Sequence, residues 1–214
     1  MNVEIKICGL GSAEDRRAAE EAGADYLGVV FTTSPRQRSE GEARAIWVDA
    51  VAKRVGVFAD AAEQTVLDVA GRLDLNVVQL HGAEEPICCR RVSEAGEWAV
   101  WKAVRLREER ELETALERYS PVVDGLVVEG WSPRGHGGVG ARFDWSWLEG
   151  ARESWPEGLR LVLAGGLNPD NVAEAIGRIR PAVVDVSSGV EAAPGVKDPD
   201  AIAAFVEAVR SASR

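Results

Sequence analysis

Short apolar runs rich in β-branched residues alternate along the chain with segments in which apolar residues recur at helical spacing. Most of these runs are almost continuously apolar, which is typical of parallel strands that are buried on both faces and joined by crossover helices. The pattern predicts eight strands, at residues 3–7, 26–31, 54–58, 77–80, 99–104, 125–128, 159–163 and 183–186.

The helical segments begin with recognisable signals. The last of them carries apolar residues at the i, i+3, i+4 and i+7 positions of one helix face. Two of the predicted capping residues have a carboxylate three residues further on, and the other two precede a proline, which suits the first position of a helix. The predicted caps are Ser12, Asp60, Asn168 and Asp198.

Strands that alternate with helices in this way fit either an open, doubly wound sheet or a closed barrel. The strands are evenly spaced along the 214 residues, which favours closure. No linker-like or low-complexity segment divides the sequence. We therefore predict an α/β protein with the fold of a single-domain (β/α)8 TIM barrel, with residues 1–214 forming that one domain.

The charge balance narrows the classes of partner. The chain has 25 Lys and Arg against 35 Asp and Glu, a net charge of -10, which argues against electrostatic binding to nucleic acid or to an anionic membrane. No apolar run approaches the length of a membrane span, and the N-terminal residues lack the features of a signal peptide. We expect a cytoplasmic protein, either a monomer or a homodimer.

The few cysteines and histidines give no support to a disulfide framework or a structural metal. Cys88 and Cys89 are adjacent on a predicted helix and are poorly placed to bond to each other. With only His81 and His136 available besides the cysteines, a tetrahedral zinc site would need an improbable convergence. We expect free thiols and no metal.

In a barrel of this kind, functional residues gather at the carboxyl ends of the strands. Glycines after the seventh strand let the backbone approach a ligand, and a helix is predicted to begin just beyond them, at Asn168 and Pro169. Hydroxyl groups and a further glycine follow the eighth strand. These adjacent loops predict a phosphorylated small-molecule substrate, although single glycine pairs are more often simple turns. The predicted phosphate-binding residues are Gly165, Gly166, Ser187, Ser188 and Gly189.

Six motifs follow one another from the first strand to the last: KICGL at 6–10, SPRQRS at 34–39, VVQLHG at 77–82, GGVGARFDWSWL at 137–148, LAGGLNPDNV at 163–172 and DVSSGVE at 185–191. Together they resemble phosphoribosylanthranilate isomerase. The resemblance implies a (β/α)8 barrel of tryptophan biosynthesis that needs no metal and no organic cofactor. Its reaction would be the Amadori rearrangement of N-(5-phosphoribosyl)anthranilate to the 1-deoxyribulose phosphate isomer.

That reaction needs an acid that protonates the ribose ring oxygen as the ring opens, and a base that removes the C2′ proton from the resulting Schiff base. Cys8, at the end of the first strand, matches the general base of the family. Lys6 shares its strand face and carries a positive charge. A cysteine at the edge of an apolar strand is usually a small core residue, and we expect Cys88 and Cys89 to be of that kind.

The acid departs from the family pattern, because this chain has a glutamate where relatives have an aspartate. Glu129, which ends the run LVVE, is the best match for the general acid. Its pKa must be raised if it is to be protonated near neutral pH, and the anionic groups of the substrate, with Asp185, are expected to raise it. His136 in the following loop is the second candidate, and Asp124 at the start of the strand is the third.

The remaining expectations concern contacts with the substrate. By resemblance, Arg36 binds the anthranilate carboxylate, and Arg38 and Arg134 are less specific alternatives. Asp185 is expected to accept hydrogen bonds from ribose hydroxyls, and His81 is expected to line the pocket.

The glycines of residues 130–142 predict a loop that closes over the bound sugar, unless it is a plain connection. Two other functions fit the same features. One is a different aldose–ketose isomerase that acts on another sugar phosphate. The other is a non-catalytic phosphate-binding barrel, which would result if glutamate cannot replace the aspartate.

Overall fold

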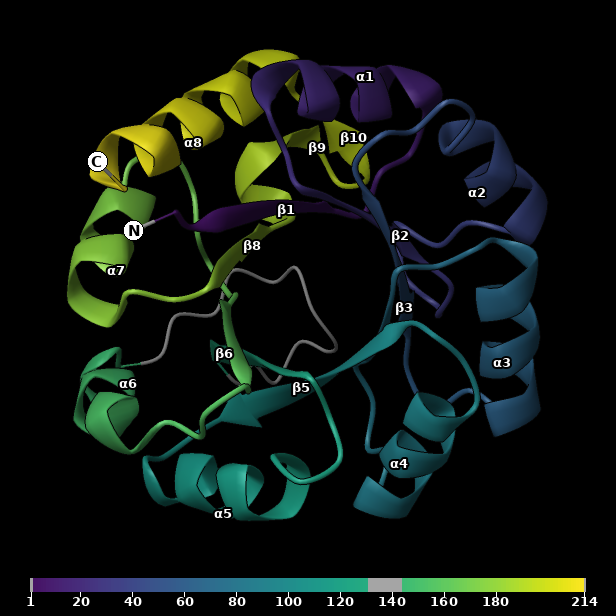
Figure 1. Ribbon diagram of the computed structural model, residues 1–214. Helices are drawn as coiled ribbons and strands as arrows, with labels where there is room; N and C mark the ends of the chain where they lie inside the picture. The colour runs from purple at the N-terminus through teal and green to yellow at the C-terminus, as the bar shows by residue number, and fades with distance from the viewer. Residues whose placement is uncertain (1, 131–143, 214) are drawn as a thin grey trace.

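A closed barrel of eight parallel strands forms the centre of the protein, as the sequence predicts (Figure 1). The computed structural model describes residues 2–130 and 144–213. Each strand pairs with its neighbour in sequence and β1 pairs with β8, so the barrel has no free edge. The strands are β1 (Glu4–Cys8), β2 (Tyr26–Val30), β3 (Lys53–Phe58), β4 (Val77–Leu80), β5 (Ala99–Leu106), β6 (Gly125–Gly130), β7 (Arg160–Leu163) and β8 (Val183–Val186).

Helices surround the barrel on its outer side (Figure 1). They follow the strands in sequence, which gives the alternation predicted from the hydrophobic pattern. The α-helices are α1 (Ala13–Ala22), α2 (Glu40–Ile46), α3 (Glu63–Arg72), α4 (Pro86–Glu94), α5 (Arg110–Tyr119), α6 (Ser146–Ala151), α7 (Val172–Ile179) and α8 (Pro199–Ala212). Two single turns of 3-10 helix are η1 (Arg152–Ser154) and η2 (Ser188–Val190).

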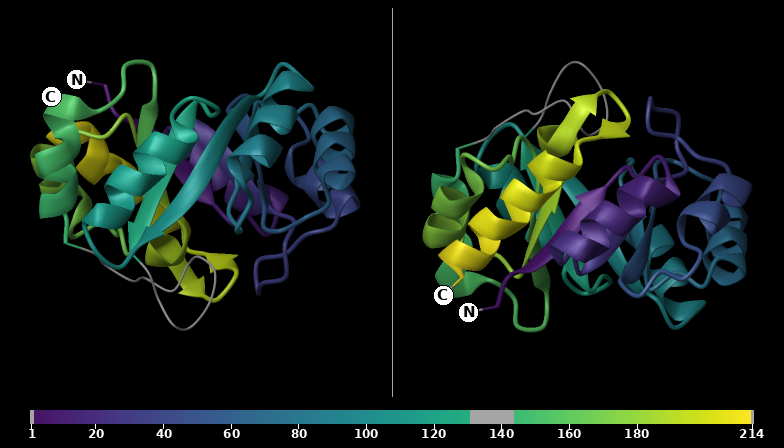
Figure 2. Two further views of the ribbon diagram at one scale, coloured as in Figure 1. Left: turned by 90° about the horizontal axis from the view of Figure 1, so that it is seen from below. Right: turned by 90° about the horizontal axis from the view of Figure 1, so that it is seen from above.

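A short antiparallel hairpin follows η2 and was not predicted. It pairs β9 (Glu191–Ala193) with β10 (Val196–Lys197). Strands of this length are too short to show an alternating pattern of apolar and polar residues. The hairpin projects from the end of the barrel opposite to the two chain termini (Figure 2).

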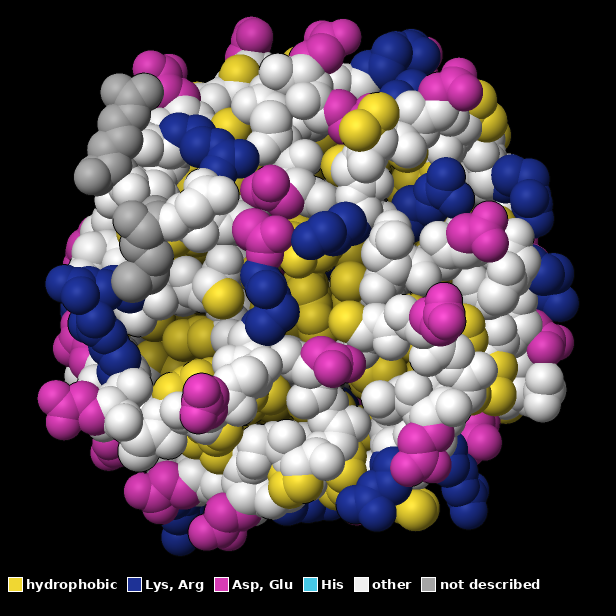
Figure 3. Space-filling model, in the orientation of Figure 1, with side chains coloured by type: hydrophobic (Ala, Val, Ile, Leu, Met, Phe, Trp, Pro, Cys, Tyr) yellow, Lys and Arg dark blue, Asp and Glu magenta, His cyan; other side chains and the backbone are white. Residues whose placement is uncertain are grey.

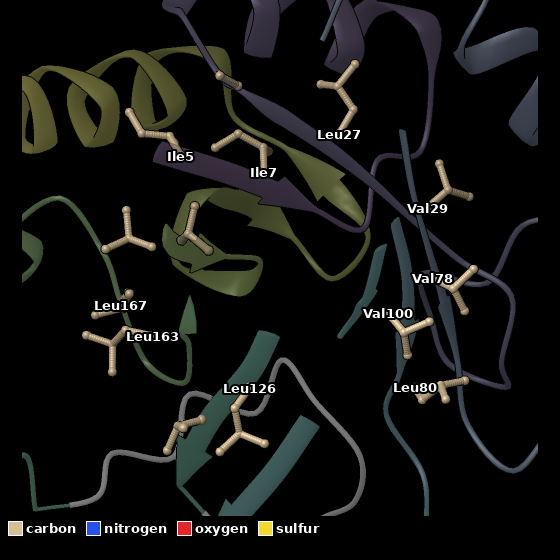
Figure 4. Packing of buried hydrophobic residues seen from close by; sticks show 14 of the residues in the cluster. Ile5, Ile7, Leu27, Val29, Val78, Leu80, Val100, Leu126, Leu163 and Leu167 are labelled. Carbon is tan, nitrogen blue, oxygen red and sulfur yellow. The ribbon is translucent and has the colours of Figure 1, made fainter. Parts of the chain in front are cut away.

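Strand side chains point alternately outward to the helices and inward to the barrel axis. Ile5 and Ile7 of β1, with Leu27 and Val29 of β2, point outward and are fully buried in the layer between strands and helices (Figure 4). Burial on both faces explains why the strands read as continuous apolar runs. A second cluster lies inside the barrel: Tyr26, Val55, Val77, Trp101, Ala103, Val127, Val162, Ala164 and Val183.

Charged side chains close the amino-terminal end of the barrel, which faces the viewer in Figure 1 and appears as a surface in Figure 3. Glu4 lies at the centre of this cluster and accepts hydrogen bonds from Lys53 Nζ at 3.2 Å, from the Tyr26 hydroxyl at 3.1 Å, and from Arg160. These bonds join β1, β2, β3 and β7. Glu4 therefore ties four strands together at this end, although the buried Nε of Arg160 has no hydrogen-bond partner among the described residues.

Three of the predicted helix caps can be judged here. Ser12 and Asp198 each accept a backbone N–H at the start of their helices, α1 and α8, so these two predictions are confirmed. The cap predicted at Asp60 is wrong, because its carboxylate accepts the backbone N–H of Ala83 at 2.7 Å and α3 begins without a side-chain cap. Asp60 therefore joins two neighbouring loops.

Candidate active site

The carboxyl ends of the strands surround a cavity that is partly open to solvent. Its walls come from the ends of strands and the loops that follow them, so residues far apart in sequence meet there. The candidates that the sequence places first all line it: Cys8, Arg36, His81, Glu129 and Asp185, with Gly165, Gly166, Ser187, Ser188 and Gly189. The sequence therefore predicted one site rather than scattered residues.

A buried ion pair lies beside Cys8 in the barrel. Lys6 is 0% exposed, stands opposite Asp185 in the pairing of β1 with β8, and donates from Nζ to Asp185 Oδ2 at 2.7 Å. The other carboxylate oxygen of Asp185, Oδ1, is buried and has no hydrogen-bond partner among the described residues. Lys6 thus uses one of the two acceptor oxygens of Asp185 and leaves the other unpaired at the cavity wall.

Cys8 is a protonated thiol at neutral pH. Burial raises the pKa of Cys8 above its ordinary value of 9.0, and the positive charge of Lys6 offsets this only in part. The negative charge of Asp185 also raises it. Lys6, which lies on the same strand face, therefore does not convert Cys8 into a thiolate in the free protein.

Glu129 lies next to the last residue of β6 and is 6% exposed. Its Oε1 accepts hydrogen bonds from His81 Nε2 at 3.0 Å and from Arg105 Nε at 2.9 Å. Burial raises the pKa of Glu129, but His81 and Arg105 together lower it by more, so the pKa lies below its ordinary value of 4.5. The carboxyl is therefore ionised at neutral pH in the free protein, and a pKa raised by bound substrate stays a prediction.

Gln79 fixes the orientation of the His81 ring. Its Nε2 lies 2.9 Å from His81 Nδ1, so the amide donates to Nδ1 and the Nε2–H of the ring faces Glu129. Gln79 is 1% exposed, and its own Oε1 has no partner among the described residues. The hydrogen bonds thus run in one direction from Gln79 through His81 to the carboxylate.

Arg36 reaches the cavity in a fixed orientation. Its Nε and Nη2 donate to the two oxygens of Glu191, each at 2.7 Å, and Lys197 Nζ donates to the same carboxylate at 2.9 Å. The stem of Arg36 lies over Gly9, where an added Cβ would come within 2.6 Å of Arg36 Cδ. Arg36 Nη1 has no hydrogen-bond partner in the described part of the chain, and it can therefore reach a second anion.

The loops after β7 and β8 lie against each other at the edge of the cavity. Gly165 and Gly166 have φ angles of 84° and 69°, and neither backbone N–H donates to another described residue. An added Cβ on Gly189 would lie 1.9 Å from the carbonyl oxygen of Leu167, so only glycine fits at that contact. The two loops therefore offer backbone donors that a larger residue at position 189 would displace.

The helix expected to begin at Asn168 and Pro169 starts three residues later, and this prediction is wrong. Asn168 Oδ1 accepts the backbone N–H groups of Asp170 and Asn171 at 3.0 and 3.1 Å, which closes a turn, and α7 begins only at Val172. An asparagine competes with helix formation in this way by bonding to its own following backbone. Backbone and hydroxyl donors, rather than a helix terminus at Pro169, are what the loops present to an anion.

Of the other two candidates for the acid, Asp124 is described and lies away from the cavity. Asp124 lies just before β6, at the opposite end of the barrel, where its carboxylate accepts the backbone N–H of Val100 at 2.7 Å. His136 and Arg134, like all of the predicted closing loop except Gly130, lie outside the described residues. Glu129 is thus the first-choice acid that the described part of the chain places beside the cavity.

Comparison with known proteins identifies the family. Residues 5–208 match the family model described as N-(5'-phosphoribosyl)anthranilate (PRA) isomerase. The chain belongs to the phosphoribosylanthranilate isomerase family. The phosphoribosylanthranilate isomerase of Trichlorobacter lovleyi is 43% identical over 217 residues, which cover 98% of this chain and 99% of that relative. The one from Thermotoga petrophila is 46% identical over 210 residues, covering 96% and 97%.

Solved phosphoribosylanthranilate isomerase structures share the barrel. The crystal structure from Thermotoga maritima has a TM-score of 0.88 at 42% identity and covers 98% of this chain and 100% of its own. A second phosphoribosylanthranilate isomerase, in complex with reduced 1-(o-carboxyphenylamino)-1-deoxyribulose 5-phosphate, has a TM-score of 0.85 at 40% identity, with the same coverage. The predicted family and fold are thereby confirmed.

Four side chains that contact the candidate residues were not singled out from the sequence: Gln79, Arg105, Glu191 and Lys197. Two of them belong to motifs that were noticed, since Gln79 lies in VVQLHG and Glu191 ends DVSSGVE. Arg105 shares an inward face with other residues of β5, but only the register shows that it meets Glu129. Nothing in the sequence distinguishes Lys197.

Cys88 and Cys89 lie in α4, away from the cavity, and all three cysteines are free thiols, as expected. Burial raises the pKa of Cys89 to about 12. Among residues 2–130 and 144–213, no group of three or more His, Cys, Asp or Glu side chains is arranged to hold a metal ion. No helix in those ranges is long and apolar enough to cross a membrane.

Proposed function

We propose that this chain catalyses the isomerisation of N-(5'-phosphoribosyl)anthranilate to 1-(2-carboxyphenylamino)-1-deoxyribulose 5-phosphate, a step of tryptophan biosynthesis. The observation that carries the proposal is that one cavity of a family member is lined by a thiol, a carboxyl group, an arginine and two phosphate-type loops. Each of these groups can either bind one part of that substrate or transfer a proton in its rearrangement. The enzyme is an aldose–ketose isomerase and needs no cofactor for this reaction.

The substrate groups divide the cavity between them. The phosphate is bound by the backbone and hydroxyl donors of Gly165, Gly166 and the Ser187-Ser188-Gly189 turn. Arg36 binds the anthranilate carboxylate through the nitrogen that Glu191 does not use. The free Oδ1 of Asp185 accepts a hydrogen bond from a ribose hydroxyl.

Cys8 and Glu129 exchange protons with the sugar. A proton on Glu129 passes to the ring oxygen as the C1′–O bond breaks and the anthranilate nitrogen lone pair forms the Schiff base. The Cys8 thiolate then takes the C2′ proton, whose bonding electrons flow into the C1′–C2′ bond and give the enolamine. The enolamine tautomerises to the ketone product. His81 holds the Glu129 carboxyl during both steps through its Nε2.

The protonation states of the free protein are the reverse of those that start the reaction. Glu129 rests as a carboxylate and Cys8 rests as a thiol, because their pKa values are shifted down and up respectively. The reactive form, with the proton on Glu129, contains the same number of protons. Its population is therefore small but independent of pH across the interval between the two pKa values.

The cellular setting and assembly are part of the same proposal. A biosynthetic isomerase of phosphorylated intermediates acts in the cytoplasm, and we place this chain there. We expect a monomer or a homodimer. One solved relative is described as monomers of a dimeric phosphoribosylanthranilate isomerase from Thermotoga maritima, and both states therefore stay in the proposal.

The test is turnover of freshly generated N-(5'-phosphoribosyl)anthranilate, followed by loss of its anthranilate fluorescence. The wild-type chain is expected to accelerate the loss, and Cys8→Ser and Glu129→Gln are each expected to lower kcat by about a thousandfold while the protein remains folded. Cys88→Ser is the matched control and should retain activity, since Cys88 lies in α4. If the wild-type chain leaves the fluorescence unchanged, the proposed function is wrong.

A further inference from the structure

The longer acid at position 129 has a partner on the neighbouring strand. Arg105 stands directly opposite Glu129 in the parallel register of β5 and β6, and both belong to the inward-facing positions of their strands. Arg105 donates from Nε to Glu129 Oε1 at 2.9 Å and from Nη2 to the backbone carbonyl of His81 at 2.7 Å. One guanidinium group therefore joins the ends of β4, β5 and β6.

This arrangement distinguishes the two carboxylate oxygens of Glu129. His81 Nε2 donates to the same oxygen as Arg105, Oε1, at 3.0 Å. No described residue donates a hydrogen bond to Oε2. A glutamate has one more rotatable bond than an aspartate, and two donors on one oxygen remove the freedom that this bond would add.

We propose that Arg105 is a positioning residue of the isomerase site, which holds Glu129 by Oε1 so that Oε2 meets the ring oxygen of the substrate. The inference rests on the proposed function of the site. Arg105 is absent from the described lining of the cavity, whereas Glu129 and His81 are part of it. Arg105 therefore acts through Glu129 and does not touch the sugar.

The charges around Glu129 agree with this role. On the β7 side, Leu163 and Ala164 are buried and apolar, so the donors that face the carboxyl come from β4 and β5. Loss of Arg105 removes one of the two groups that lower the pKa of Glu129. The other titratable or charged residues of the described cavity wall are Cys8, Arg36 and Asp185.

The first experiment compares Arg105→Gln with Arg110→Gln, a matched change at an exposed arginine of α5. Arg105→Gln is expected to lower kcat about tenfold or more and to leave KM within about twofold, because the acid is misplaced while the binding groups remain. The acidic limb of the kcat/KM profile should move to higher pH, since the pKa of Glu129 rises. Arg110→Gln should match the wild type in all three measurements.

A second experiment tests whether Arg105 acts through Glu129. In Glu129→Asp the shorter side chain does not reach Arg105, so adding Arg105→Gln to that background is expected to change kcat by less than about twofold. An equal loss of kcat in both backgrounds would overturn the proposal. So would an acidic limb that stays in place in Arg105→Gln.

Two further measurements test the role of Arg105 even if Arg105→Gln does not fold or the wild type shows no turnover. Arg105→Lys retains a cation and provides a test if Arg105→Gln does not fold; it should recover part of kcat and keep the acidic limb close to that of the wild type. An NMR titration of labelled glutamate, with the Glu129 signal assigned from its loss in Glu129→Gln, reports the pKa without any turnover. An unmoved pKa in Arg105→Gln contradicts the role of Arg105 without any turnover assay. Absent wild-type turnover instead contradicts the proposed function, on which the catalytic part of that role rests.

Discussion

Cys8 and Glu129 are both buried, yet their pKa values move in opposite directions from their ordinary ranges. Burial disfavours the charged form of each group and so raises both values. Only Glu129 has two hydrogen-bond donors directly on it, from His81 and Arg105, and these outweigh burial. Local contacts, rather than burial alone, therefore decide which of the two residues is charged in the free protein.

The state of Cys8 gives a direct prediction at the residue scale. Its pKa lies above 9.0, so the thiolate is absent at neutral pH and forms only as pH rises past that value. The ultraviolet absorbance of the thiolate, taken as the difference between the wild type and Cys8→Ser, should appear only above about pH 9. The kcat/KM profile should fall in the same range, because loss of this proton leaves no proton for Glu129 to donate. A Cys8 thiolate signal at neutral pH would contradict both expectations.

The sequence predicted which residues line the cavity better than it predicted their hydrogen-bond partners. Cys8, Glu129 and Asp185 stood out because each follows or interrupts an apolar run. Their partners Lys6 and Arg105 lie on neighbouring strands, and these contacts depend on register. Register is a property of pairing between strands, so a single strand's pattern of apolar residues does not contain it.

At the scale of elements, the contact between the loops after β7 and β8 is the tightest feature of the site. The Gly189 position touches the Leu167 carbonyl so closely that a methyl group does not fit. Both loops carry predicted phosphate ligands, so a change in their separation acts on phosphate binding first.

Gly189→Ala should therefore raise KM by about tenfold or more and change kcat less, because the loss is mainly in ground-state binding of the phosphate. Gly177→Ala in α7 is the matched control, since an added Cβ there meets no atom within 4 Å. The measurement is steady-state kinetics, which gives KM and kcat of both variants for comparison with the wild type. An unchanged KM in Gly189→Ala would show that these loops do not bind the phosphate.

Strand boundaries were predicted within two residues and the start of α7 was missed by three, and these misses have local causes. β5 and β6 run two residues beyond their predicted ends, to Leu106 and Gly130, since pairing with a neighbouring strand continues through Arg105 and Glu129. The turn at Asn168 delays α7, because its side chain bonds to the backbone that a helix would have used. Arg105 and Glu129 were each taken to lie just after the end of a strand, but pairing with the neighbouring strand includes both. Asn168 was taken as the start of a helix, but it lies in a turn that precedes the helix.

At the scale of the whole molecule, the net charge of -10 opposes the approach of an anionic substrate. The cations near the cavity are largely offset by carboxylates, as in the pairs of Lys6 with Asp185 and Arg36 with Glu191. The long-range field is therefore set by the acidic surface, whereas binding depends on short contacts inside.

A salt whose anion does not bind at the phosphate loops should therefore raise kcat/KM, because it screens the repulsion between the acidic surface and the anionic substrate. Raising sodium chloride from about 10 mM to about 150 mM shortens the screening length from about 30 Å to about 8 Å and is expected to raise kcat/KM by about twofold. The measurement is the initial rate at substrate concentrations well below KM, with kcat as the control that should change little. A fall in kcat/KM would mean that the basic groups at the cavity dominate the approach.

The buried thiol of Cys8 has one more consequence. Peroxide and electrophiles attack thiolates far faster than thiols, and attack also requires access to the sulfur. Cys8 is 8% exposed and carries its proton at rest, so the group proposed as the base is kept in the form that oxidants attack most slowly. The thiolate exists only during the fraction of time in which Glu129 holds the proton, and the same proton that starts the reaction therefore protects the sulfur between turnovers.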